Sequence, residues 1–151
     1  MRTFLLLLHL VGMAAFLGVL LVNARIKKVA ETSGDEGLLR FAYDLVRRND
    51  ARIGGPGFGL LLVGGLGLAG MWGGAVARPW FFTSMALLVP MFLGWMGMML
   101  PAQVKLTKLE DLGSLVRQNL SRRWDMGWWI TVLSLLAITF LMIGKDALGM
   151  P

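Results

Sequence analysis

The sequence predicts an all-α, polytopic membrane protein: a bundle of four transmembrane helices with amphipathic cytoplasmic linker helices, forming one membrane domain over residues 1–151. Two observations support this. Of the 151 residues, 56% are hydrophobic and 20 are glycine, whereas only 16% are charged. This composition is too apolar to cover the surface of a soluble domain. The apolar residues are also gathered in four long runs. An ordinary soluble enzyme is therefore excluded.

In chain order, the expected spans cover residues 3–24, 57–77, 80–102 and 126–144. The first contains one ionisable residue, His9, and the others contain none. Each run has at least 19 residues, enough for a helix that rises about 1.5 Å per residue to cross a hydrocarbon core of about 30 Å. The first run is longer than the apolar core of a typical signal peptide, so we interpret it as a retained span.

The basic residues predict the orientation of the spans. Twelve of the 15 Lys and Arg residues lie in the linkers between spans one and two and between spans three and four. Cytoplasmic loops carry such an excess of positive charge. We therefore expect a bacterial inner-membrane protein with both linkers in the cytoplasm and both termini outside. The net charge of +6 is then an orientation signal, and no nucleic-acid partner is expected.

Tryptophans lie near the ends of several spans, as in an interfacial belt. These residues are Trp72, Trp80, Trp124, Trp128 and Trp129, whereas Trp95 lies within span three.

The linkers themselves have helical patterns. Residues 33–36 have the Ser-x-x-Glu form of a capping box and precede apolar residues at helical spacing. A second pattern runs from Leu109 to Leu120. Two interpretations stay open: amphipathic helices that rest on the inner membrane surface, or cytoplasmic extensions of the spans.

His9 is the only histidine in the chain. An ionisable residue at membrane depth is a candidate functional residue by default. Its imidazole could be an axial ligand of haem iron, so that haem b is a candidate cofactor, or a ligand of copper. The structural alternative is a neutral histidine hydrogen-bonded to a neighbouring helix.

Three methionines are expected at the same depth as His9: Met71, Met85 and Met142. A set of one His with Met side chains suits Cu(I) or a His/Met haem. Methionine is also a flexible apolar filler of helix interfaces.

Span two and the residues just before it are rich in glycine. Gly55 and Gly59, and Gly70 and Gly74, have GxxxG spacing, and Gly65 with Ala69 has the looser small-xxx-small form. Small residues let helix backbones approach closely inside a membrane. This face is predicted to pack within the bundle or against other membrane protein subunits.

Pro90 lies near the middle of span three, where it removes a backbone bond to Ala86 and is expected to kink the helix. A kink beside Gly94 could form a pocket for a ring-shaped or lipid-like ligand, or it could be plain bundle geometry.

The absence of Asp, Glu, Lys and Arg from the four runs argues against a proton relay or an ion pump. The chain contains no cysteine and no Ser-His-Asp combination. We therefore expect that the protein is not an enzyme.

Several short motifs resemble an uncharacterised family of predicted bacterial integral membrane proteins. They include His9-Leu10-x-Gly12, Arg52-x-x-x-Pro56-Gly57, Pro79-Trp80 and Leu141-Met142-x-x-Lys145. That family is distantly similar to the copper-resistance D-type membrane domain and to the haem-pathway membrane protoporphyrinogen oxidase. The resemblance implies a helical bundle in which His9 matches the first-span histidine of those groups. The other histidines expected there are absent from this chain.

Two functions follow as hypotheses. The first is a non-catalytic accessory or assembly subunit that packs against a larger membrane complex, such as one of electron transfer, through its glycine-rich span. The alternative is a redox membrane protein that binds haem b or copper through His9. A small carrier or lipid-binding protein with a cavity beside Gly94 is a third hypothesis.

Overall fold

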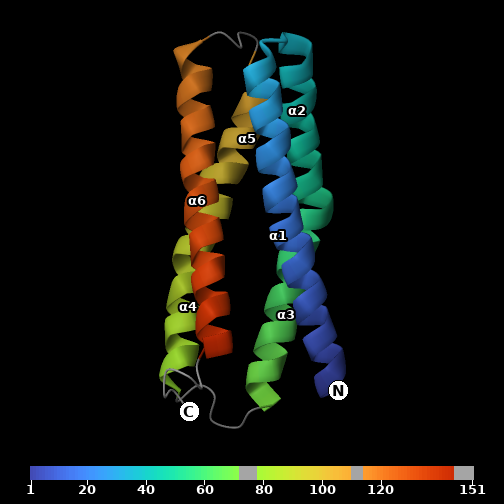
Figure 1. Cartoon of the computed structure of the whole chain (residues 1–151), viewed down its shortest axis with the longest axis vertical. Coiled ribbons are helices and arrows are strands. Elements are labelled where there is room, and N and C mark those ends of the chain that lie inside the picture. Colours follow the sequence, from blue (N-terminus) through green and yellow to red (C-terminus); the bar gives the residue numbers. More distant parts are fainter. Residues whose placement is uncertain (72–77, 110–113, 145–151) are drawn as a thin grey trace.

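The computed structural model describes residues 1–71, 78–109 and 114–144, and almost all of these residues are helical (Figure 1). The helices are α1 (Arg2–Ser33), α2 (Glu36–Asn49), η1 (Asp50–Gly54), α3 (Gly55–Met71), α4 (Pro79–Phe92), η3 (Leu93–Met99), α5 (Leu100–Leu106) and α6 (Leu115–Gly144). The segments η1 and η3 are π-helical.

These elements form four long rods. α2, η1 and α3 follow one another without a break from Glu36 to Met71, and α4, η3 and α5 do so from Pro79 to Leu106. Each of the four rods is long and apolar enough to cross a membrane. The predicted all-α, four-span fold class is confirmed.

The linker patterns are extensions of the spans. α2 continues directly into α3 and lies beside α1 along its length (Figure 1). Residues 115–120 are already the first turns of α6. The helix α2 begins differently from the prediction: its N-cap is Asp35, whose side chain accepts a hydrogen bond from the Leu38 amide, and not Ser33. Gly34, at φ 72°, closes α1 in the left-handed conformation that favours glycine, so the next residue is the first one free to cap α2.

Pro90 lies inside α4, and the π-helix η3 begins three residues after it. Proline cannot donate a hydrogen bond to the preceding turn, and irregular turns of this kind redirect a helix axis. In Figure 1, α5 is tilted relative to α4.

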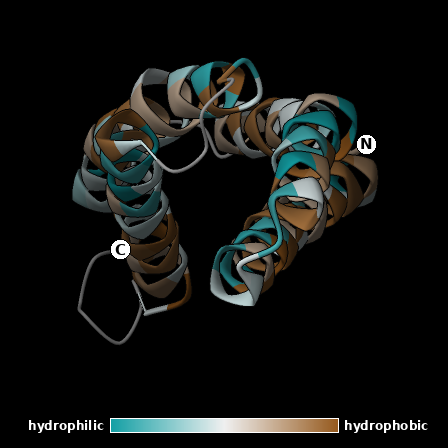
Figure 2. Ribbon diagram, turned by 90° about the horizontal axis from the view of Figure 1, so that it is seen from above, coloured by the Kyte–Doolittle hydropathy of each residue, from teal (hydrophilic) through white to brown (hydrophobic). Residues whose placement is uncertain are grey.

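The rods pack as two pairs, which we call the N-terminal pair (α1 with α2, η1 and α3) and the C-terminal pair (α4, η3 and α5 with α6). Glycines allow close backbone contact in each. A Cβ on Gly12 of α1 would lie 2.3 Å from the Leu61 nitrogen of α3. In the C-terminal pair, a Cβ on Gly94 would lie 2.7 Å from the Gly127 oxygen. Viewed from above, the helices form two groups with a gap between them (Figure 2).

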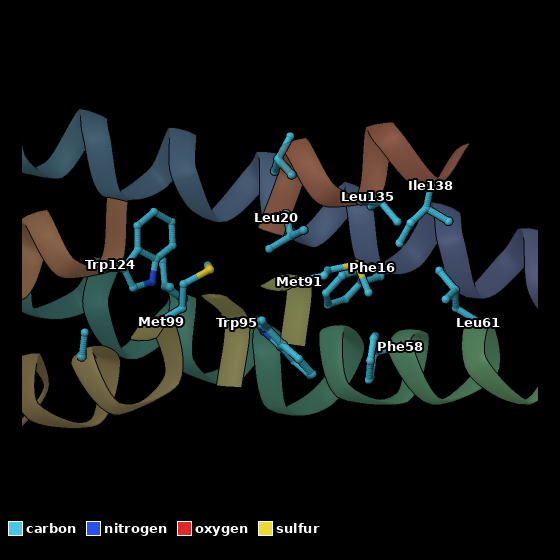
Figure 3. Packing of buried hydrophobic residues seen from close by; sticks show 13 residues of the cluster. Phe16, Leu20, Phe58, Leu61, Met91, Trp95, Met99, Trp124, Leu135 and Ile138 are labelled. Atoms are coloured by element: carbon cyan, nitrogen blue, oxygen red, sulfur yellow. The ribbon is translucent and has the colours of Figure 1, made fainter. Parts of the chain in front are cut away.

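An aromatic cluster joins the pairs at mid-height (Figure 3). The ring of Trp95 lies 5.1 Å from that of Phe16, edge to face, and 5.2 Å from that of Phe58. The cluster separates two halves of the bundle. We call them the terminal half, which contains the start of α1 and the end of α6, and the linker half, which contains the end of α1 and the start of α6.

The tryptophans near the ends of the spans have different surroundings. Trp80 and Trp124 are 3% and 2% exposed and pack inside the bundle. Trp129 is exposed, and Trp128 donates a hydrogen bond from Nε1 to the Leu20 carbonyl at 2.8 Å. Trp72 lies outside the described residues. A position near the end of a span does not say which side of a helix faces the neighbouring rod, and the interfacial belt stays a prediction.

Candidate functional site

A cavity of about 350 Å³ lies in the terminal half, between the N-terminal and C-terminal pairs. Side chains from α1, α3, α4 and α6 line it, and most of them are apolar, such as Leu10, Leu66 and Leu88. Small-molecule sites have volumes of this order and a few polar groups in an apolar lining. This cavity is therefore the candidate site.

His9 is a half-buried member of the cavity lining. Its Nδ1 lies 2.8 Å from the Leu61 carbonyl oxygen. Since a carbonyl only accepts hydrogen bonds, Nδ1 carries the hydrogen, and in the neutral ring Nε2 has a free lone pair. Gly65 provides the space: a Cβ there would lie 3.0 Å from Nδ1 and from Cε1 of the ring. The Nδ1–Cε1 edge thus rests on α3, and Nε2 is the ring nitrogen that can accept a bond from another molecule.

Few other polar groups line the cavity. Ser84 of α4 is fully buried, and within the described part of the chain its hydroxyl has no hydrogen-bond partner. Thr139 of α6 donates its hydroxyl hydrogen to the Leu135 carbonyl at 2.8 Å. Arg2 is exposed at the first turn of α1 and is the charged residue among those that line the cavity.

The structure brings together two of the three predicted methionines. Met85 of α4 and Met142 of α6 line the same cavity as His9. Met71 is 43% exposed at the end of α3 and is not part of the lining. One imidazole and two thioethers are donors that suit Cu(I), and an Nδ1–H bonded to a backbone carbonyl is how metal-ligating histidines are usually oriented. In the described residues, no group of three or more His, Asp or Glu side chains could hold a metal ion.

The predicted packing residues of α3 have different surroundings. Gly65 and Ala69 line the cavity. A Cβ on Gly55 would meet only the Asp50 carbonyl oxygen of its own rod at 3.5 Å, and one on Gly59 or Gly70 would meet no atom within 4 Å. Gly74 lies outside the described residues. The glycines of α3 that touch the α1 backbone are instead Gly57 and Gly64.

The predicted pocket beside Gly94 is absent from the described structure. Gly94 is buried, and a Cβ there would lie 2.7 Å from both the Gly127 oxygen and the Thr131 hydroxyl. The space beside Gly94 is filled because α6 also has a glycine, Gly127, at the contact. The cavity lies closer to the helix ends.

A polar network in the linker half was missed by sequence reasoning. Asp50 of η1 is 1% exposed, and its two carboxyl oxygens accept hydrogen bonds from the side-chain amides of Asn23 (3.0 Å) and Gln103. The Asn23 amide also donates to the Val46 carbonyl, and its oxygen accepts from Asn49. This network joins α1, η1 and α5. The sequence does contain a signal for this network. Asn23, Asp50 and Gln103 each lie near the linker end of one of the first three apolar runs.

A second network joins the ends of α1, α2 and α6. Lys27 is 3% exposed and binds Glu31 at 3.0 Å and Asp125 at 2.8 Å, with its ammonium 5.1 Å from the centre of the Trp124 ring. Glu31 also accepts hydrogen bonds from Tyr43 and Ser121. These residues lie beyond the apolar run that ends at Ala24. Burial raises the pKa of the Glu31 carboxyl, but the Ser121 hydrogen bond and the Lys27 charge outweigh it, so the pKa lies below its usual value.

The comparisons with known proteins identify a family. Residues 3–146 match the family model described as a predicted integral membrane protein, DUF2269. No curated protein and no solved structure matches the chain. Because the match covers almost the whole sequence, the chain belongs to this family of integral membrane proteins.

Proposed function

We propose that this member of the DUF2269 family is a non-catalytic membrane protein that binds a small lipophilic ligand in the cavity of its terminal half, with His9 as the main polar contact. The observation that supports this most directly is the combination of an apolar cavity of about 350 Å³ with a histidine whose Nδ1 is already held by the Leu61 carbonyl. A side chain fixed in this way presents Nε2 without further ordering, which favours binding.

Haem b and copper are two candidate ligands for this site. His9 would supply the axial nitrogen to haem iron, or would hold Cu(I) together with Met85 and Met142. Either metal, when bound, would add one-electron redox chemistry to a lining that has none of its own. The protein would contribute orientation of the imidazole and exclusion of water.

The experiment compares wild type with Ala69→Leu, which places a larger side chain in the cavity. The matched control is Ala86→Leu on an exposed face of α4. Each protein is purified in mild detergent and analysed by native mass spectrometry, visible absorption and elemental analysis. We expect a bound small molecule, a Soret band or bound copper in wild type and Ala86→Leu, and its loss in Ala69→Leu. Equal retention in all three proteins would refute a ligand in this cavity.

The accessory-subunit hypothesis is supported by a different observation. Gly59 and Gly70 lie on an exposed face of α3, where a Cβ would meet no atom of the described residues within 4 Å. Such a face leaves room for a helix of another membrane protein. In mild detergent, we expect a partner subunit to co-purify with wild type and to be lost from Gly59→Leu. A monodisperse monomer without any co-purifying protein would contradict this function.

The distribution of basic residues supports placement of the linker half in the cytoplasm of a bacterial inner membrane, with both termini outside. Because the chain contains no cysteine, single-cysteine variants test this cleanly. We expect Thr32→Cys, at the exposed end of α1, to resist a membrane-impermeant maleimide in intact spheroplasts and to react after lysis. Labelling in intact spheroplasts would reverse the assignment.

A further inference from the structure

The hydrogen-bonding state of His9 restricts what the cavity can bind. Nδ1 donates to the Leu61 carbonyl, so a neutral His9 offers the ligand only the lone pair of Nε2. An imidazolium would need a counter-charge, and the described residues that line the cavity include no Asp or Glu. The group that meets His9 must therefore supply either a hydrogen-bond donor or a metal ion.

Ser84 adds a second requirement on another wall of the cavity. Its side chain is 0% exposed and lines the cavity from α4, whereas His9 lies on α1. A buried hydroxyl with no partner costs free energy, which a ligand oxygen would recover. A metal bound to His9 alone would leave this hydroxyl unsatisfied.

The remaining lining indicates what lies between these two groups. Trp80, Phe81 and Met85 belong to α4, and Leu10 and Leu66 lie on the other pair. Aromatic rings and thioethers pack favourably against a further ring. The ligand should thus be a ring with oxygens at two positions.

We propose that the ligand is a lipophilic hydroquinone, with one phenolic hydroxyl donating to Nε2 of His9 and the other oxygen bonded to the hydroxyl of Ser84. This inference rests on the proposed function, because it names the ligand class of the same cavity. It concerns binding only. A quinone without hydroxyl hydrogens presents acceptors alone, and two acceptors cannot form a hydrogen bond, so the reduced form binds more tightly than the oxidised form.

The test uses the full-length protein in detergent under anaerobic, reducing conditions. The probes are tetramethylhydroquinone and its dimethyl ether, which has the same ring but no donor hydrogens. Binding is measured by calorimetry. We expect the ether to bind at least about tenfold more weakly than the hydroquinone, because His9 would be left without a donor.

Two variants locate the contacts. Ser84→Ala removes a hydroxyl that has no partner among the residues that the structure describes, so it should fold normally, and it should weaken hydroquinone binding by about fivefold to tenfold. His9→Phe should reduce the preference for the hydroquinone over the ether. The control is Thr83→Val on the exposed face of α4, which should bind like wild type. Thermal unfolding confirms that each variant is folded.

The outcomes separate the two proposals. Equal affinity for the hydroquinone and its ether, or unchanged binding by Ser84→Ala, would overturn the hydroquinone assignment. Haem or copper retained by wild type and lost from Ala69→Leu would also overturn it, while supporting a ligand-binding cavity. Binding of the hydroquinone by Ala69→Leu with wild-type affinity would place the probe elsewhere and count against both proposals.

Discussion

The two halves of the bundle are built in opposite ways. In the linker half, directional polar bonds join the N-terminal pair to the C-terminal pair: Gln103 to Asp50, Ser121 to Glu31, and Lys27 to Asp125. In the terminal half, the pairs face one another across an apolar cavity, and a long contact of 4.0 Å runs between the Thr139 hydroxyl and the Met13 sulfur. The pairs are thus held together at one end and apart at the other.

This difference matters because association of helices in a membrane has little hydrophobic driving force. A cavity between two helix pairs would tend to close as the pairs pack together. Polar bonds at a distance from the cavity fix the relative position of the pairs without occupying it. The aromatic cluster of Phe16, Phe58 and Trp95 separates the two environments.

The largest effect is expected from breaking the ion pairs of the linker half. Lys27→Met should lower the free energy of unfolding by up to about 3–5 kcal/mol, because the partly buried Glu31 loses its counter-charge. The half-exposed Asp125 reduces the loss. The control is Lys28→Met, which changes an exposed neighbour. Denaturant unfolding followed by circular dichroism measures both. Equal denaturation midpoints for Lys27→Met and Lys28→Met would show that the ion pairs do not stabilise the linker half.

The network around Asp50 should have the next largest effect. Gln103→Leu removes one of the two amide donors to a buried carboxyl and should cost about 1–3 kcal/mol. Gln118→Leu, at an exposed position of α6, is the control and should change stability little. Combining Gln103→Leu with Asp50→Leu should cost less than the sum of the single changes, because the two side chains share one bond. Strict additivity would contradict the network.

The sequence could predict the fold because each apolar run is long enough to be recognised as a membrane span. Four uncharged runs separated by basic linkers leave few alternatives for a chain of this composition. The sequence does not decide whether α2 continues into α3 or rests on the membrane surface. An amphipathic helix can bury its apolar face against lipid or against a neighbour such as α1.

The sequence could predict the candidate site only in part. His9 was identifiable because it is an ionisable residue within a span, and Met85 and Met142 because they lie at its depth. The roles of Ser84 and Asp50 depend on the rotation of each rod about its axis, which composition does not specify. Glycine spacing was ambiguous for the same reason. Gly57 and Gly64 contact α1, whereas a Cβ on Gly59 would meet no atom within 4 Å in the described part of the chain.

A smaller effect of opposite sign is expected when the cavity is filled. Ala69→Leu should stabilise the ligand-free protein by up to about 1 kcal/mol, because the added carbons gain van der Waals contacts that the open space lacks. Ala86→Leu, whose side chain is exposed on α4, should leave stability nearly unchanged. Thermal unfolding of ligand-free protein measures the difference. Destabilisation by Ala69→Leu would mean that the two pairs are already in contact there.

The smallest effect sharpens the comparison most, because it changes the same residue type in each half. Ser84 and Ser121 are both buried, but Ser121 donates a hydrogen bond to Glu31 at 2.6 Å, whereas the Ser84 hydroxyl has no partner in the described structure. Ser121→Ala should therefore destabilise the protein about as much as Gln103→Leu. Ser84→Ala should not lower the free energy of unfolding and should raise it by up to about 0.5 kcal/mol, since it removes a buried hydroxyl that has no partner among the described residues. Denaturant unfolding of both variants in the same buffer measures the two changes in the free energy of unfolding. Equal losses would mean that the terminal half also depends on polar bonds, and that the Ser84 hydroxyl serves the fold and not a ligand.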